Sequence, residues 1–104
     1  MHDTTPYVYV FVRTDLSHPQ IVVQASHACL EMASAHGMPY HPHLVCIGIK
    51  SEAKLRSVLN EITAQGIRAS PFIEPDIGDQ MTAFATEPVF GERRKVFKRF
   101  SLLR

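Results

Sequence analysis

A row of hydrogen-bonding side chains is the part of this sequence best suited to chemistry. One predicted helix carries, at spacings of four, three, four and three positions, Gln20, Gln24, His27, Glu31 and Ser34. Such spacing places all of them on one helix face. Two amides can orient a carbonyl or hydroxyl group of a substrate, and an imidazole can transfer a proton near neutral pH. The alternative interpretation is a structural histidine beside surface amides, with no catalytic role.

The helix that carries this polar stripe has clear start and end signals. Ser17 can cap it, Pro19 suits its first turn, and Gln20 stands at the capping-box position. We expect it to run to about His36, with Gly37 at its end. The rest of its circumference is apolar, so we expect the stripe to be the face that a sheet leaves exposed.

The other predicted elements alternate between strands and helices. They are strands over residues 7–12, 43–49, 67–73 and 80–86, a helix between Ser51 and Gly66, and a short helix after Pro88. Residues 100–103 end the chain as a strand or an apolar plug. Pro71 interrupts the third strand, so we expect a bend or a sheet edge there.

This order of elements predicts an α/β fold, with a mixed four-stranded sheet and helices packed on both faces. Ligands usually bind such sheets where strands end and helices begin. The turn after Val12 and the loop after Ile73 are therefore the expected positions of a site.

Length and composition limit the class of protein. With 104 residues, 45% hydrophobic and 20% charged, the chain fits one globular domain over residues 1–104 and not a disordered segment. No apolar run approaches the roughly 20 residues of a membrane span, and the N-terminus lacks the regions of a secretory signal. Cys29 and Cys46 are too few for a disulfide framework. We therefore expect a cytoplasmic protein with reduced thiols.

Basic residues are concentrated at the C-terminal end, although the net charge is only +1. Six of them lie in the last twelve positions: Arg93, Arg94, Lys95, Lys98, Arg99 and Arg104. This basic tail could contact RNA phosphates, or it could be a solvated face. Phe97 and Phe100 could stack on bases or dock the tail onto the domain.

Other constellations carry less chemistry. The spacing of His36, His41, His43 and Cys46 does not match common zinc sites. The sequence has no P-loop, no dinucleotide-binding glycine motif and no nucleophile elbow. We therefore expect neither a metal nor a cofactor.

Several segments, taken in order, resemble the type 2 peptidyl-tRNA hydrolases, the class typical of archaea and eukaryotes. The segments are RTDL (13–16), QASHA (24–28), EPDIG (74–78), TAFATEP (82–88) and KRFSLL (98–103). Together they cover nearly the whole chain. In its shortness the chain is similar to the minimal peptidyl-tRNA hydrolase domain-containing relatives.

The resemblance implies hydrolysis of the ester between a peptide and the 3′ end of tRNA, without a cofactor, by a protein that tends to form homodimers. It implies a site lined by Arg13, Asp15, Gln24, His27, Asp76 and Thr82. Asp76 would orient water or act as the base, and His27 and Thr82 would hydrogen-bond the substrate. Arg13 would meet phosphate or pair with Asp15, and that pair could equally serve only to fix the turn.

Two positions depart from the family pattern. Gln20 stands where the family has a lysine, so a charge-assisted contact worth about 1.5–3 kcal/mol is missing. The family's Asp-x-Gly-x-Thr reads Asp76-Ile-Gly78-Asp79-Gln80, which lacks the threonine and adds an acid. A non-catalytic RNA- or protein-binding module, or a hydrolase of a smaller acyl substrate, therefore remain alternatives.

Overall fold

A computed structural model describes residues 4–38 and 41–104. The first three residues, part of the segment from which we expect no secretory signal, lie outside the described residues. Along the chain the elements are β1 (Tyr7–Arg13), α1 (His18–His36), β2 (His43–Ile49), α2 (Glu52–Ala64), β3 (Ala69–Glu74), the 3-10 helix η1 (Pro75–Ile77), β4 (Gln80–Thr86) and the 3-10 helix η2 (Gly91–Phe97). The strands form one sheet in the order β2-β1-β4-β3. β1 pairs with β2 in parallel, and the other two pairings are antiparallel. The predicted mixed four-stranded sheet is thus confirmed.

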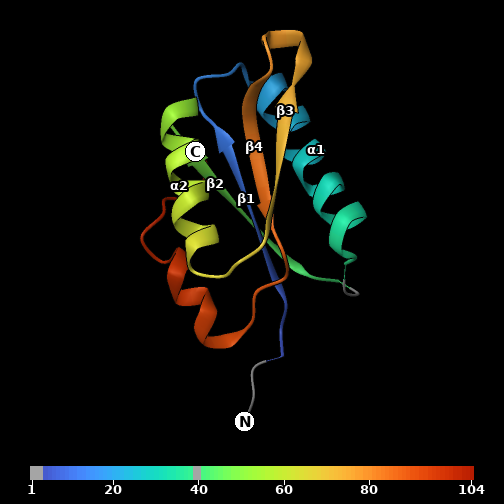
Figure 1. The fold of residues 1–104 in the computed structure, drawn as a ribbon, viewed down its shortest axis with the longest axis vertical. Helices are drawn as coiled ribbons and strands as arrows, with labels where there is room; N and C mark the ends of the chain where they lie inside the picture. The colour runs from blue at the N-terminus through green and yellow to red at the C-terminus, as the bar shows by residue number, and fades with distance from the viewer. Residues whose placement is uncertain (1–3, 39–40) are drawn as a thin grey trace.

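Two hydrophobic cores lie on opposite faces of this sheet, as Figure 1 shows by the positions of α1 and α2. Phe11 and Phe84, with ring centroids 4.5 Å apart, are part of the core under α2. Val10 and Val12 belong to the other core, under α1. Because β1 and β4 are central, nearly all their residues are buried, which explains their continuous apolar sequence.

The predicted helix ends are confirmed. The Ser17 side chain accepts a hydrogen bond from the Gln20 backbone, and Ser51 accepts one from that of Lys54. Gly37, with φ +74°, ends α1 and donates its N–H to the Ala33 carbonyl. Across the described ranges, no helix combines the length and apolar character needed to cross a bilayer.

The structure differs from the sequence-based expectation at the start of the third strand, whereas the sheet edge expected at Pro71 is confirmed. β3 starts at Ala69, because Ile67 is buried in the core under α2 instead of pairing in the sheet. Pro71 lies on this edge strand, and the register shifts between Phe72 and Ile73. At the other edge, Leu102 forms an isolated bridge with Ile47 of β2.

Candidate active site

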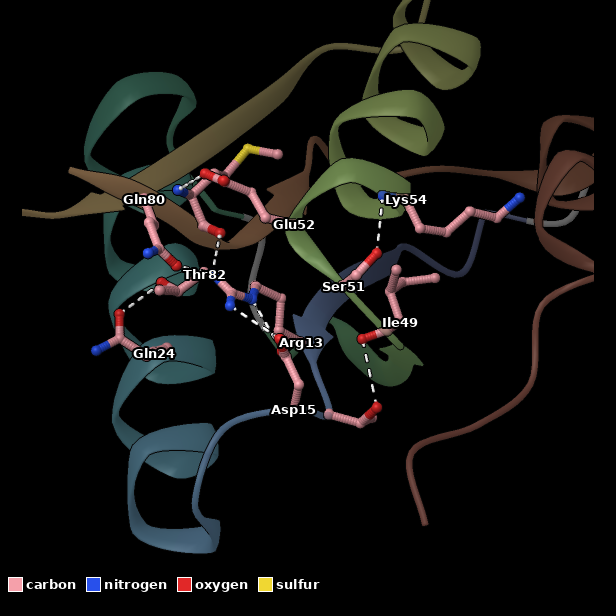
Figure 2. A network of polar contacts seen from close by, with 11 residues as sticks. Arg13, Asp15, Gln24, Ile49, Ser51, Glu52, Lys54, Gln80 and Thr82 are labelled. Atoms are coloured by element: carbon pink, nitrogen blue, oxygen red, sulfur yellow. Dashed lines mark hydrogen bonds and ion pairs between the residues drawn. The ribbon is translucent and has the colours of Figure 1, made fainter. Parts of the chain in front are cut away.

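A buried arginine connects the end of β1 to the start of β4 (Figure 2). The Arg13 side chain donates Nε and Nη2 to the two carboxylate oxygens of Asp15, at 2.9 Å each. Its Nη1 donates to Gln80 Oε1 at 2.7 Å and to the Met81 carbonyl at 3.3 Å. Such a two-pronged pair is strongly directional. Arg13 therefore fixes both the turn into α1 and the first residues of β4.

This ion pair stays charged over a wide pH range. The two hydrogen bonds from Arg13 hold the pKa of the Asp15 carboxyl below its usual range. The Arg13 pKa is raised chiefly by its hydrogen bond to Asp15, against the opposing effect of burial. The interpretation of the pair as a fixed turn is thus the one that the contacts support.

We expect Asp15→Asn to lower the free energy of unfolding by less than about 1 kcal/mol at neutral pH, since Asp15 is partly exposed. The Asp15 pKa is lower in the folded chain, so its carboxylate stabilises the fold above the unfolded-state value of about 4. This stabilisation is lost as the pH falls through the folded value. Denaturant unfolding at pH 7 and pH 3 should show that the difference in unfolding free energy between the wild type and Asp15→Asn is smaller at pH 3. A difference that does not change with pH would contradict a stabilising role of the Asp15 carboxylate.

A second hydrogen-bonded chain joins the sheet to the exposed start of α1. Thr82 Oγ1 of β4 donates to Gln24 Oε1 at 2.6 Å, and Gln24 Nε2 donates to Gln20 Oε1 at 3.0 Å. Thr82 and Gln24 are fully buried, whereas Gln20 is exposed. Because the Gln20 oxygen accepts from Gln24, its own amide N–H groups can donate to a ligand.

The predicted polar stripe on α1 is therefore not one exposed face. Gln24 is buried against the sheet, whereas the other residues of the stripe are exposed. The buried face of α1 consists of Ile21, Gln24, Ala28 and Met32. This face includes the amide of Gln24 and leaves Val22 and Leu30 of the same helix 66% exposed. The sequence could not show which face of α1 packs on the sheet, since α1 is apolar over most of its circumference.

His27 lies on the β3 side of α1. Its imidazole stacks on the Phe72 ring, with centroids 4.6 Å apart and planes within 6°. His27 is exposed and follows Gln24 by one helical turn, so it lies beside the second hydrogen-bonded chain. It can therefore meet a ligand that also reaches Gln20.

Asp76 lies on η1, in the turn between β3 and β4. Figure 1 shows this turn at the same end of the sheet as the connection between β1 and α1. Asp76 is exposed, and within residues 4–38 and 41–104 its side chain forms no hydrogen bond or ion pair. Gly78 and Asp79 both have positive φ, which makes the turn tight. Asp76 thus shares the end of the sheet with Arg13 without contacting it.

Glu52 was not recognised from the sequence as a site residue. Its Oε2 accepts the Met81 backbone N–H at 2.7 Å (Figure 2). The same oxygen accepts a bond from Arg56 Nη2 at 3.1 Å. The Met81 N–H is the main reason that the Glu52 pKa is lowered. Arg13 and Glu52 therefore both hydrogen-bond the backbone of Met81 at the start of β4. The sequence showed only that Glu52 follows the helix cap Ser51.

The three basic residues proposed for substrate binding lie at the other end of the sheet. Arg94 contacts Tyr7, the first residue of β1, and Arg13 is the last, so the strand separates them by about 20 Å. Arg93 donates to the Gly66 carbonyl at 2.9 Å, and Lys95 pairs with Glu92 at 2.7 Å. The structure therefore brings Arg13, Asp15, Gln20, Gln24 and Thr82 to one end of the sheet. Of the basic tail, Arg93, Arg94 and Lys95 lie at the other end, whereas Arg104 lies beside His18 and Ile21 at the start of α1.

The architecture is that of an α/β domain with a polar cluster where its first strand ends. No protein-family model matches the chain, and no curated protein matches it. Among solved structures, it is similar to the Protein of Unknown Function Atu0240 from Agrobacterium tumefaciens strain C58. The TM-score is 0.71 at 16% identity, and the match covers 95% of this chain and 98% of that chain. This likeness shows the fold alone.

Proposed function

We propose that this protein hydrolyses the ester between a peptide, or a blocked amino acid, and the 3′ end of tRNA. The observation that supports this most is the chain from Thr82 through Gln24 to Gln20. A hydroxyl and an amide buried between sheet and helix add little net stability compared with apolar packing. Their presence next to the Arg13 network is therefore better explained by a role in chemistry.

The proposed reaction needs a positioned water, a base and donors for the developing oxyanion. In our assignment, Asp76 orients the attacking water and accepts its proton, and the Gln20 amide N–H donates to the ester carbonyl oxygen as it gains charge. The bond to the ribose 3′ oxygen then breaks, and that oxygen takes up the proton and leaves as the free hydroxyl of tRNA. His27 hydrogen-bonds the substrate from the neighbouring turn. Gln24 and Thr82 act through Gln20 as positioning residues, because their polar atoms already bond each other.

Arg13 has a supporting role in this proposal. Four of its five N–H donors are directed to Asp15, Gln80 and the Met81 carbonyl. With these contacts, the guanidinium joins the turn after β1 to the start of β4. Its assigned role does not include binding a phosphate of the substrate.

We expect the purified protein to release a blocked amino acid from tRNA slowly and to leave the tRNA intact with a free 3′ hydroxyl. His27→Ala and Asp76→Ala should each lower the rate by about 10²-fold, as expected for proton-transfer or water-positioning groups. Glu31→Gln, exposed on the same helix, is the matched control and should leave the rate unchanged. Analysis of both reaction products by gel and chromatography measures this.

Two results would contradict the proposed function. Binding of tRNA without release would favour the non-catalytic RNA-binding module. Release that is unaffected by His27→Ala and Asp76→Ala would show that the ester is cleaved elsewhere.

A further inference from the structure

We propose that the stacked rings of His27 and Phe72 form a platform on which the base of the 3′-terminal adenosine of tRNA stacks. The choice of this adenosine rests on the proposed function, whereas the ability to stack a flat base follows from the two rings. Phe72 belongs to β3, the edge strand of the sheet, and α1, which carries His27, lies beside this strand (Figure 1). The platform therefore lies at the edge of the sheet, where a ligand can reach it.

The two rings lie parallel, with the imidazole on the outside. Their planes are within 6° and their centroids are 4.6 Å apart, so the Phe72 ring covers one face of the imidazole. Phe72 is half-buried and packs against the core under α1, which fixes its ring from below. His27 is nevertheless exposed. Its exposed surface therefore belongs to the opposite face of the imidazole and to the ring edge.

An exposed ring face that is backed by a second ring is suited to a nucleobase. Proteins stack unpaired bases on Phe, Tyr, Trp and His side chains, and one stacked base raises the affinity by about tenfold or more. A surface histidine without a backing ring would sample several rotamers, and ordering it would cost part of this gain. Because Phe72 already holds the imidazole plane, a base meets a preformed surface.

An irregularity between β3 and β4 places the platform next to the candidate active site. Phe72 pairs with Ala83, and the following pair skips Thr82, which is therefore an extra residue on β4. Such a bulge turns a side chain out of the regular alternation of the strand. As a result, Thr82 and Ala83 both face α1, where Thr82 donates to Gln24. The Phe72 ring thus lies close to the start of the hydrogen-bonded chain that ends at Gln20.

The spacing along α1 suits a nucleoside. His27 follows Gln20 by seven positions, which is about 10 Å along the helix axis. An adenosine has a similar length between the outer edge of its base and its 3′ oxygen. Val23 is exposed between the two residues, one turn from each, and offers an apolar surface to the ribose. A base stacked on His27 therefore places the ester near the Gln20 amide.

Stacking and hydrogen bonding use different parts of the imidazole. Within residues 4–38 and 41–104 the ring nitrogens of His27 form no hydrogen bond, and they lie at the edge of the ring plane. The face can thus hold the base while a ring nitrogen reaches the substrate. The two roles are separable by substitution, because phenylalanine keeps a stacking face and lacks the nitrogens.

The test is the affinity for an adenosine that carries a blocked amino acid through a 3′ amide, compared with the same compound without its base. The wild type should bind the complete compound about tenfold more tightly. The H2 and H8 NMR signals of the adenine should move upfield as the base stacks on the ring. Equal affinities for the two compounds would overturn the platform, because the aminoacyl part would then account for the binding.

Four variants locate the contact. His27→Phe should keep the affinity for the complete compound, whereas His27→Ala should lose about tenfold. Phe72→Leu should weaken binding about three- to sixfold, because the imidazole then samples about three χ1 wells and two ring orientations. Phe90→Leu is the matched control and should change nothing, since it removes an exposed ring next to Val89, which bridges to Tyr7 at the other end of β1. An equal loss in His27→Phe and His27→Ala would overturn the stacking, because the hydrogen-bonding edge would then explain the affinity.

Release of the amino acid from tRNA separates this inference from the proposed function. If both hold, His27→Phe binds the amide compound as the wild type does and releases the amino acid as slowly as His27→Ala. A wild type whose binding depends on the base but which releases nothing would contradict the proposed function and support the platform.

Discussion

Gln20→Lys is expected to raise the rate of ester release by about ten- to a hundredfold. The exposed amide of Gln20 is the terminal donor of the chain that starts at Thr82. A lysine at this position would supply a charge-assisted hydrogen bond to the developing oxyanion, worth about 1.5–3 kcal/mol, which corresponds to one to two decades in rate. Single-turnover release of a blocked amino acid from tRNA measures the effect on the chemical step.

A neutral replacement is the control for this prediction. Gln20→Met has similar length but no donor, so it should lower the rate, while all three proteins should bind tRNA equally well. If Gln20→Lys is folded, binds tRNA and releases the amino acid no faster than the wild type, the assignment of Gln20 to the oxyanion is wrong.

Thr82→Val is expected to lower the free energy of unfolding by about 1–3 kcal/mol and turnover by roughly 10²-fold. The substitution leaves the fully buried Gln24 Oε1 without its 2.6 Å partner. Gln24 is then free to turn, and the Gln20 amide that it orients is no longer held in place. Denaturant unfolding and the release assay measure the two effects separately.

The double variant Thr82→Val/Gln24→Leu separates stability from function. Replacing both partners by apolar groups of similar shape can restore most of the lost stability. Turnover should stay low, because no group then orients Gln20. Recovery of turnover together with stability would contradict the assigned positioning role and would leave only a packing role for this pair.

The sequence was sufficient to predict the fold because local signals and hydrophobic patterns agreed. Ser17 and Gly37 mark the ends of α1, and the continuous apolar residues of β1 and β4 mark the centre of the sheet. The sequence could not show which side of α1 meets the sheet. That helix is apolar on several sides, so no periodicity separates buried Gln24 from exposed Val22.

The contacts that build the site join residues far apart in the chain. Arg13 and Gln80 are separated by 67 positions, and Gln24 and Thr82 by 58. Only the register of β1 with β4 and the packing of α1 on β4 bring them together. The same holds for the basic tail, whose Arg94 is positioned by Tyr7 and Tyr9 at the beginning of the chain.

The most direct test of the candidate site is an NMR titration with an aminoacyl adenosine analogue in which an amide replaces the ester. We expect shifts of the Gln20 side-chain amide and the His27 imidazole signals when the analogue binds. If the analogue binds and shifts signals elsewhere while those of Gln20 and His27 stay unchanged, the candidate active site is not where the substrate's ester is held.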